Sequence, residues 1–283
     1  MSQPRYRHDI VLLAQSSRGG KRLLYRVFTL GSQNISPRVL RVDDRVGWII
    51  TLIGIPSAFL LHGYVGFIFG PIKANPWWST PLMPVVFLFS AMVSGIALVL
   101  LMYMLTSFIR RTAIDMRCLD TIAKYLLYTF IIDFTLEMLD LIHRIYESDE
   151  SFRSLDFMVH TRLFVSQIVL QIFLGTLVPI GLLAATQFVR FTEAGRERIY
   201  ALAGILTMIG IFAMRWNVVI AGQLFSKSFL GYTTYKMDFV TREGLLPAVI
   251  LLILPFVILY VLIKVLPPWH EENISALQAD GID

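Results

Sequence analysis

The chain has 283 residues, of which 56% are hydrophobic and only 16% charged, whereas soluble domains carry about 45–50% apolar and about 25% charged residues. This composition excludes a soluble globular domain. The net charge of +5 does not indicate nucleic acid binding, because nine of the 25 Lys and Arg residues are concentrated in residues 1–46, against three acidic residues.

Six apolar segments follow this basic start, and each is long enough to cross a membrane. A spanning helix needs roughly 20 mostly apolar residues to cross about 30 Å of hydrocarbon. The segments must be helical because lipid offers no partner for an unpaired backbone N–H or C=O. We therefore predict an all-α fold, a polytopic transmembrane helix bundle of six spans. The spans are predicted at 47–70, 82–109, 121–145, 163–189, 199–219 and 244–266.

The charge distribution predicts the orientation and the domain organisation. Lys and Arg concentrate on the cytoplasmic side of membrane proteins, so the basic N-terminal segment 1–46 is expected in the cytoplasm. Six spans then return the acidic tail 267–283 to the same side. We predict a multi-pass protein of the cell inner (cytoplasmic) membrane, in which residues 47–266 form the transmembrane domain.

The predicted outer loop at 71–81, PIKANPWWSTP, is rigid and aromatic. Trp77 and Trp78 suit the belt of aromatic side chains that forms at the membrane interface, and a surface for docking a partner protein is the alternative. Four prolines fall inside predicted spans, where each can kink its helix or serve only packing: Pro56, Pro84, Pro179 and Pro255.

Three carboxylates lie on one face of the third predicted span. Asp133, Glu137 and Asp140 are spaced at i, i+4 and i+7, which places them on the same side of a helix. An acidic residue in mid-membrane costs at least about 2.5–3.5 kcal/mol on insertion scales. We therefore predict that these carboxylates act in proton transfer. Gln167 and Gln171 likewise share one face of the fourth span.

Polar residues from other spans are expected at a similar depth. Counted from the predicted outer ends, His62, Glu137 and Gln171 all lie roughly 12 Å inside the membrane, and Arg215 also lies in the outer half. Such a cluster is typical of a site for a small ligand with two polar ends, such as a quinone, or of a proton path. Alternatively, the groups pair with one another, Arg215 with Glu137 or Asp140, and hold the helices together.

Three motifs in the chain resemble one known family. The runs IPSAFLLHGYVGFIFG (55–70), KANPWW (73–78) and MRWNVVIAGQ (214–223) are similar to polysulfide reductase NrfD proteins. Within that family they resemble the DsrP branch, the membrane subunit of a sulfite-reduction-associated electron-transfer complex.

The resemblance implies a quinone-interacting, haem-free membrane subunit of a respiratory redox complex. Such a subunit exchanges electrons between the quinone pool, here expected to be menaquinone, and a ferredoxin-like iron–sulfur subunit on the extracytoplasmic side. Other membrane and cytochrome subunits are expected in the complex. The chain would then be a subunit of a quinol-dependent oxidoreductase complex rather than an enzyme alone, and the resemblance leaves proton translocation open.

The resemblance also implies a role for one residue, because His62 lies in a matching motif and is therefore expected to bind the quinone. From their depth in the membrane, we predict that Gln171 and Arg215 contribute to the same quinone site. We expect no metal site, haem or iron–sulfur cluster in this chain, whose single cysteine is Cys118.

Three other interpretations stay open. DsrP-like chains have more spans, so the chain is expected to lack the N-terminal helices and could be a truncated, inactive assembly subunit. A second interpretation is an ion or proton transporter in which Asp133, Glu137 and Arg215 line a pathway. The third is a haem anchor with His62 and His143 as axial ligands, which an absorption spectrum would distinguish.

Overall fold

Every regular element in the described part of the chain is a helix, as predicted. The acidic tail at 267–283 and most of the basic segment 1–46 lie outside the described residues. The computed structural model describes residues 11, 23, 25, 27, 36–73, 75, 77–146, 156–157, 159–161, 163–224, 238–241 and 244–265.

The chain forms two compact units, Met1–Ile55 with Lys236–Asp283, and Pro56–Tyr235. In the first unit, helix α10 (Leu245–Val265) contains Pro255 and is apolar up to its last turn, which carries Lys264. The Tyr25 hydroxyl donates a hydrogen bond of 2.7 Å to the carbonyl of Val265, the last residue of α10.

Helix α3 (Pro37–Phe69) belongs to both units and starts ten residues before the first predicted span. Its first turns carry Arg38, Arg41 and Arg45. A helix that continues beyond the hydrocarbon layer can expose such charged side chains to water, so the apolar run marked the span but not the helix start.

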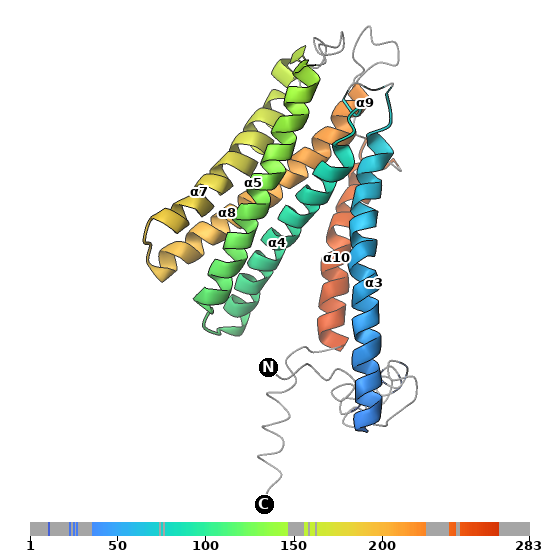
Figure 1. The fold of residues 1–283 in the computed structure, drawn as a ribbon, viewed down its shortest axis with the longest axis vertical. Helices are drawn as coiled ribbons and strands as arrows, with labels where there is room; N and C mark the ends of the chain where they lie inside the picture. The colour runs from blue at the N-terminus through green and yellow to red at the C-terminus, as the bar shows by residue number, and fades with distance from the viewer. Residues whose placement is uncertain are drawn as a thin grey trace, which may run out of the picture. The chain divides into compact units, whose positions relative to one another are not determined.

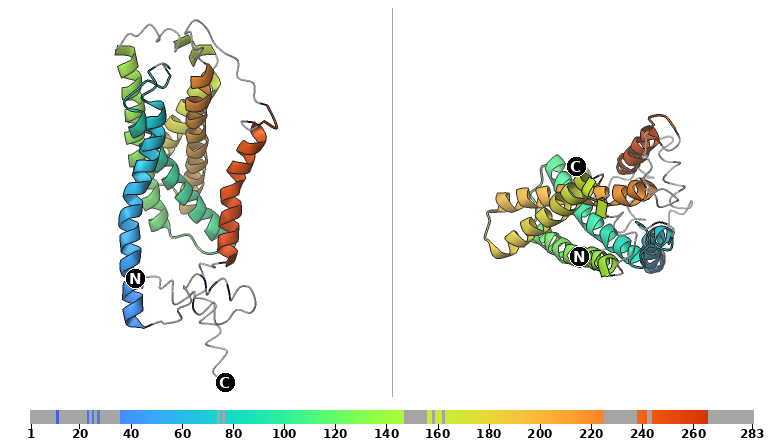
Figure 2. Two further views of the ribbon diagram at one scale, coloured as in Figure 1. Left: turned by 90° about the vertical axis from the view of Figure 1, so that its right-hand side faces the viewer. Right: turned by 90° about the horizontal axis from the view of Figure 1, so that it is seen from above.

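The second unit is a bundle in which α4, α5, α7 and α8 lie alongside one another (Figures 1 and 2). Its core is formed by apolar residues of these helices, among them Leu100, Leu126, Phe130 and Tyr200, all buried. The elements of this unit after α3 are α4 (Met83–Arg110), α5 (Met116–Tyr146), η1 (Phe164–Leu177), α7 (Val178–Phe188), α8 (Glu193–Trp216), η2 (Asn217–Ala221) and α9 (Gly222–Leu224).

Short turns join α4 to α5 and α7 to α8 at the same end of this bundle (Figure 1). Arg111 ends α4 in the left-handed conformation, with φ of 53°, and the Asp115 carboxylate accepts the backbone N–H of Arg117 at the start of α5. Thr192 caps α8 by accepting the N–H of Gly195 at 3.2 Å. These caps satisfy backbone groups that a helix end leaves without partners.

Five helical stretches of the described chain are long and apolar enough to cross a membrane, and each coincides with a predicted span. The remaining predicted span, 121–145, lies in α5, which has 31 residues. That helix is not one of the five, since it carries Asp133, Glu137 and Asp140 along its length. The described part of the chain thus contains five apolar helical stretches and one more polar helix, and the sixth span and the predicted orientation stay predictions.

Two stretches are wound as π-helices, which the apolar pattern did not predict. The segment η1 covers the first half of the fourth predicted span, and η2 follows α8. Pro179 lies in the first turn of α7, where η1 ends, and its missing N–H fits a change of helix type at this point. π-Helical turns are rare in proteins, and those that occur are often found at functional sites.

Candidate functional site

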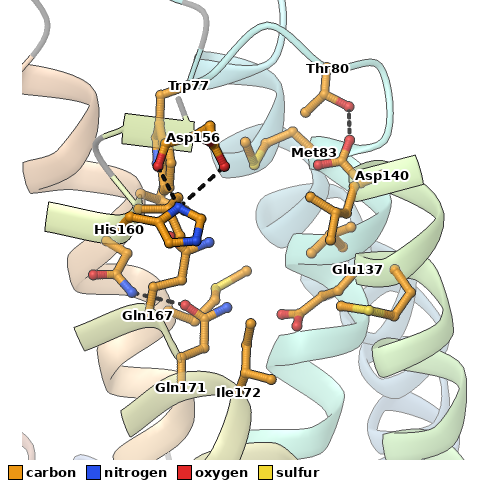
Figure 3. Close-up of a pocket in the computed structure, with 17 residues that line it drawn as sticks. Trp77, Thr80, Met83, Glu137, Asp140, Asp156, His160, Gln167, Gln171 and Ile172 are labelled. Atoms are coloured by element: carbon orange, nitrogen blue, oxygen red, sulfur yellow. Dashed lines mark hydrogen bonds and ion pairs between the residues drawn. The ribbon is translucent and has the colours of Figure 1, made fainter. Parts of the chain in front are cut away.

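A pocket of about 350 Å³ lies inside the second unit, a size that suits a small organic ligand. Helix α5 forms one wall, and η1 with the end of α8 and η2 forms the other. The loop before α4 and the residues just before η1 close the upper end (Figure 3).

The α5 wall carries two of the predicted carboxylates, Glu137 and Asp140. Their three-residue spacing places both on the face that looks into the pocket. Thr80, from the loop before α4, donates a hydrogen bond to Asp140 Oδ1. Glu137 lies deeper and points across the pocket toward Gln171 (Figure 3).

The opposite wall carries three amide side chains, those of Gln167 and Gln171 on η1 and of Asn217 on η2. Asn217 Nδ2 donates a hydrogen bond of 2.9 Å to Gln171 Oε1. Gln167 Oε1 and Asn217 Oδ1 are buried and accept a hydrogen bond from no described residue. A buried acceptor left unpaired costs about 1–3 kcal/mol, so this wall offers two sites for a ligand that donates hydrogen bonds.

Asp156 and His160 stand at the upper end of the pocket and were not among the predicted site residues. His160 Nδ1 lies 3.2 Å from Asp156 Oδ1 and 2.9 Å from the Asp156 carbonyl oxygen. The four-residue spacing of an Asp and a His just before an apolar span was the available signal. Both residues lie between the third and fourth predicted spans, outside the helix faces on which the sequence analysis rested.

Apolar side chains line the pocket between the polar groups. Three of them are methionines, whose polarisable thioethers contact aromatic rings favourably. The set includes Trp77, Met83, Val86, Met138, Leu141, Ile172, Met214 and Val218.

The loop before α4, above the pocket, is held to η2 and α9 by side chains that donate hydrogen bonds to backbone carbonyls. Trp78 Nε1 donates to the Val218 carbonyl and Asn75 Nδ2 to the Gly222 carbonyl, each at 2.6 Å. The Trp78 ring packs so closely on Gly222 that a Cβ there would lie 2.2 Å from it. Trp78 is therefore fixed against η2 and α9, and the membrane-belt role expected for Trp77 and Trp78 stays a prediction.

His62, Asp133 and Arg215 do not line the pocket, although they were predicted to belong to the same site. His62 is exposed on α3, and its Nδ1 lies 2.9 Å from the carbonyl oxygen of Ala58 on the same helix. Asp133 is only 2% exposed, one helical turn from Glu137, and its Oδ1 has no hydrogen-bond partner among the described residues.

Arg215 joins α8 to α4. Its Nη2 donates to Ser90 Oγ at 2.8 Å and to the Phe87 carbonyl at 3.1 Å, and its guanidinium carbon lies 4.1 Å from the centre of the Phe87 ring. The alternative prediction of an ion pair with Glu137 or Asp140 is therefore wrong.

Of the six predicted site residues, the structure brings Glu137, Asp140 and Gln171 together in one pocket. The chemistry of this pocket is that of two carboxylates facing three amides across an apolar gap. It can bind a flat ligand that has a hydrogen-bonding group at each end. One end would meet the amides, and the other would lie beside Glu137 and Asp140, which can accept protons.

Comparison with known proteins agrees with the motifs in the sequence. The model of the family described as "Polysulphide reductase, NrfD" matches residues 21–227. The chain is also 28% identical over 226 residues to a selenate reductase subunit of Mesobacillus selenatarsenatis, an alignment that covers 76% of this chain. The chain spans about half the length of that curated relative, 50%. Because the family model covers well over half of the chain, this multi-pass membrane protein belongs to the NrfD (polysulphide reductase) family.

Proposed function

We propose that the chain is the quinone-interacting membrane subunit of a respiratory redox complex and that the pocket between α5 and η1 binds the quinone head group. In this proposal the chain exchanges electrons between the menaquinone pool and an iron–sulfur subunit on the extracytoplasmic side of the inner membrane. Family membership and the relative described as a reductase subunit support a role in a multi-subunit reductase complex.

The donor and acceptor groups of the pocket fit both oxidation states of a quinone. A quinone presents two carbonyl oxygens that need donors, and a quinol presents two hydroxyls that need acceptors. The amides of Gln167 and Gln171 carry both kinds of group, and Glu137 and Asp140 accept as carboxylates. The methionines and Trp77 supply apolar surface for a ring.

Quinol oxidation yields two protons and two electrons, and the residues of this chain would handle the protons. Glu137, in the pocket, is placed to take a proton from a hydroxyl at the α5 end. Asp140, three residues further along α5, is placed to pass a proton toward the upper end of the pocket, where Asp156 and His160 stand. The electrons would leave to the partner subunit, because a single cysteine cannot hold an iron–sulfur cluster in this chain.

The observation that carries the proposal is a pair of buried acceptors, Gln167 Oε1 and Asn217 Oδ1, that have no hydrogen-bond partner among the described residues and lie opposite Glu137. A wall built only to hold helices together would supply each of these oxygens with an N–H or O–H donor from a neighbouring side chain or the backbone. Their location in a pocket of ligand size favours a donor from a bound molecule.

The test is a fluorescence titration of the purified chain with a fluorescent quinol-analogue inhibitor. Glu137→Gln keeps the size of the side chain but replaces a charged acceptor by a neutral one, a loss of about 1–1.5 kcal/mol or about tenfold in Kd. The matched control is Thr135→Val on the same helix, since Thr135 is exposed and its hydroxyl donates to Ile131 of its own helix. We expect the control to bind like the wild type.

His62→Ala distinguishes this pocket from the site expected from the family motif. Binding weakened by Glu137→Gln but not by His62→Ala would support the pocket. Binding weakened only by His62→Ala would move the quinone site to α3 and refute the assignment of this pocket. An absence of saturable binding by well-folded wild type would refute a quinone site in this chain.

A further inference from the structure

A second cavity, of about 280 Å³, lies between α5, α7 and α8. It is at the end of the bundle where the short turns join α4 to α5 and α7 to α8, and it shares no lining residue with the pocket above. Its walls are mainly polar, with Lys124, Gln187 and Arg196 among them. The proposed quinone chemistry makes no use of it.

Asp120, the one acidic residue among the described residues that line this cavity, is already neutralised within the bundle. Arg196 Nη1 donates to Asp120 Oδ2, and the Tyr200 hydroxyl donates to Asp120 Oδ1 at 2.9 Å. Both carboxylate oxygens are therefore engaged. The Asp120–Arg196 ion pair fixes the guanidinium at the cavity wall, and Lys124 remains as an uncompensated positive charge.

Three donors of the cavity remain available. Arg196 Nε is buried and has no hydrogen-bond partner among the described residues. Lys124 forms no ion pair with a described residue, and its ammonium lies 5.8 Å from the centre of the Tyr128 ring. Gln187 Nε2 uses one N–H on Thr186 Oγ1, at 3.3 Å, and keeps the other. A guanidinium, an ammonium and an amide around one cavity are the donor types that bind phosphate oxygens.

The cavity lies at the level expected for lipid headgroups. Lys124 is eight residues from the start of α5 and Arg196 three from the start of α8, which is about 12 Å and about 4.5 Å along the helices. Basic residues also surround this end of the bundle, among them Arg117 and Arg198. Basic pockets between membrane helices bind the headgroups of anionic lipids.

We propose that this cavity binds a phosphate group, as carried by the headgroup of an anionic phospholipid such as phosphatidylglycerol. Free inorganic phosphate presents the same chemistry, so the experiment has to separate the two sources. The proposal is independent of the quinone assignment.

The experiment is native mass spectrometry of the purified full chain in detergent, titrated with dioctanoyl phosphatidylglycerol. We expect Lys124→Gln to weaken binding at least about tenfold, since it removes a charged hydrogen bond to phosphate. The matched control is Arg198→Gln, which also removes one positive charge at this end of the bundle, from the start of α8. Arg198 is exposed and does not line the cavity, so we expect its Kd to stay within about twofold of the wild type.

Two further ligands decide what is recognised. Dioctanoylglycerol has the same acyl chains without phosphate, and equal binding of it would overturn the proposal. Inorganic phosphate is the second competitor. If it displaces the lipid at low concentration from the wild type, and less well from Lys124→Gln, the phosphate site is supported but its ligand is the free anion. Equal loss in Lys124→Gln and Arg198→Gln would show a general effect of charge and overturn the site.

Discussion

The crossing of η1 and α8 at Gly175 and Gly210 leaves no room for a methyl group. A Cβ built on Gly210 would lie 2.4 Å from Gly175 Cα and 2.8 Å from its carbonyl carbon and oxygen. These are backbone atoms of a packed helix, so the contact can be relieved only if the two helices move apart. Small residues at such crossings are what let membrane helices approach closely.

The expected cost of Gly210→Ala follows from these contacts. Overpacking of this kind costs about 3 kcal/mol, and the movement would also stretch the Asn217–Gln171 hydrogen bond further along the same two helices, worth about 1 kcal/mol. The better helix propensity of Ala returns about 1 kcal/mol. The net loss of about 3 kcal/mol corresponds to a Tm lower by about 6–12 °C for a unit of this size.

The assay is thermal unfolding of the purified chain in detergent, followed by tryptophan fluorescence. Gly181→Ala on α7 is the matched control, because a Cβ there meets nothing within 4 Å. We expect its Tm to be unchanged or slightly raised. Equal Tm values for Gly210→Ala and Gly181→Ala would show that the close helix crossing does not exist in the folded protein.

Two further predictions concern the loop and the buried carboxylate. Gly222→Ala should displace Trp78 and break its bond to the Val218 carbonyl, lowering the free energy of unfolding by about 1–3 kcal/mol. Thermal unfolding of the purified chain measures this loss. A Gly222→Ala variant as stable as the wild type would refute the close contact. If Asp133 transfers protons, Asp133→Asn should lower quinol turnover by about 100-fold in a complex assembled with the partner subunits. Membrane insertion of the variant should stay intact. Normal turnover in a well-inserted variant would remove Asp133 from the mechanism.

The helices of this protein could be predicted from the sequence because lipid imposes a simple rule. A segment that crosses hydrocarbon must be apolar, helical and about 20 residues long, so five apolar runs matched five apolar helices. The shared face of Glu137 and Asp140 was also predictable, since it depends only on spacing within one helix. The NrfD family was predicted correctly from three short motifs and confirmed by the family match. The DsrP branch remains a prediction.

The site was predicted only in part, because the rise per residue gives depth but not direction. Counting residues placed His62 and Arg215 at the level of Glu137 and Gln171. The structure shows that His62 is exposed on α3 and that Arg215 bonds to Ser90 on α4. The direction in which a side chain points, relative to its neighbours, depends on how each helix is rotated in the bundle, and no single segment contains that information.

The sequence by itself determined which segments are helical, which helices carry polar groups and which of these groups share a helix face. Only the tertiary structure decided which faces meet. The bond from Trp78 to Val218 joins residues 140 positions apart, and Asn217 reaches Gln171 across two π-helical segments. Such pairs result from the packing of whole helices, whose close approach at Gly175 and Gly210 depends on both partners at once.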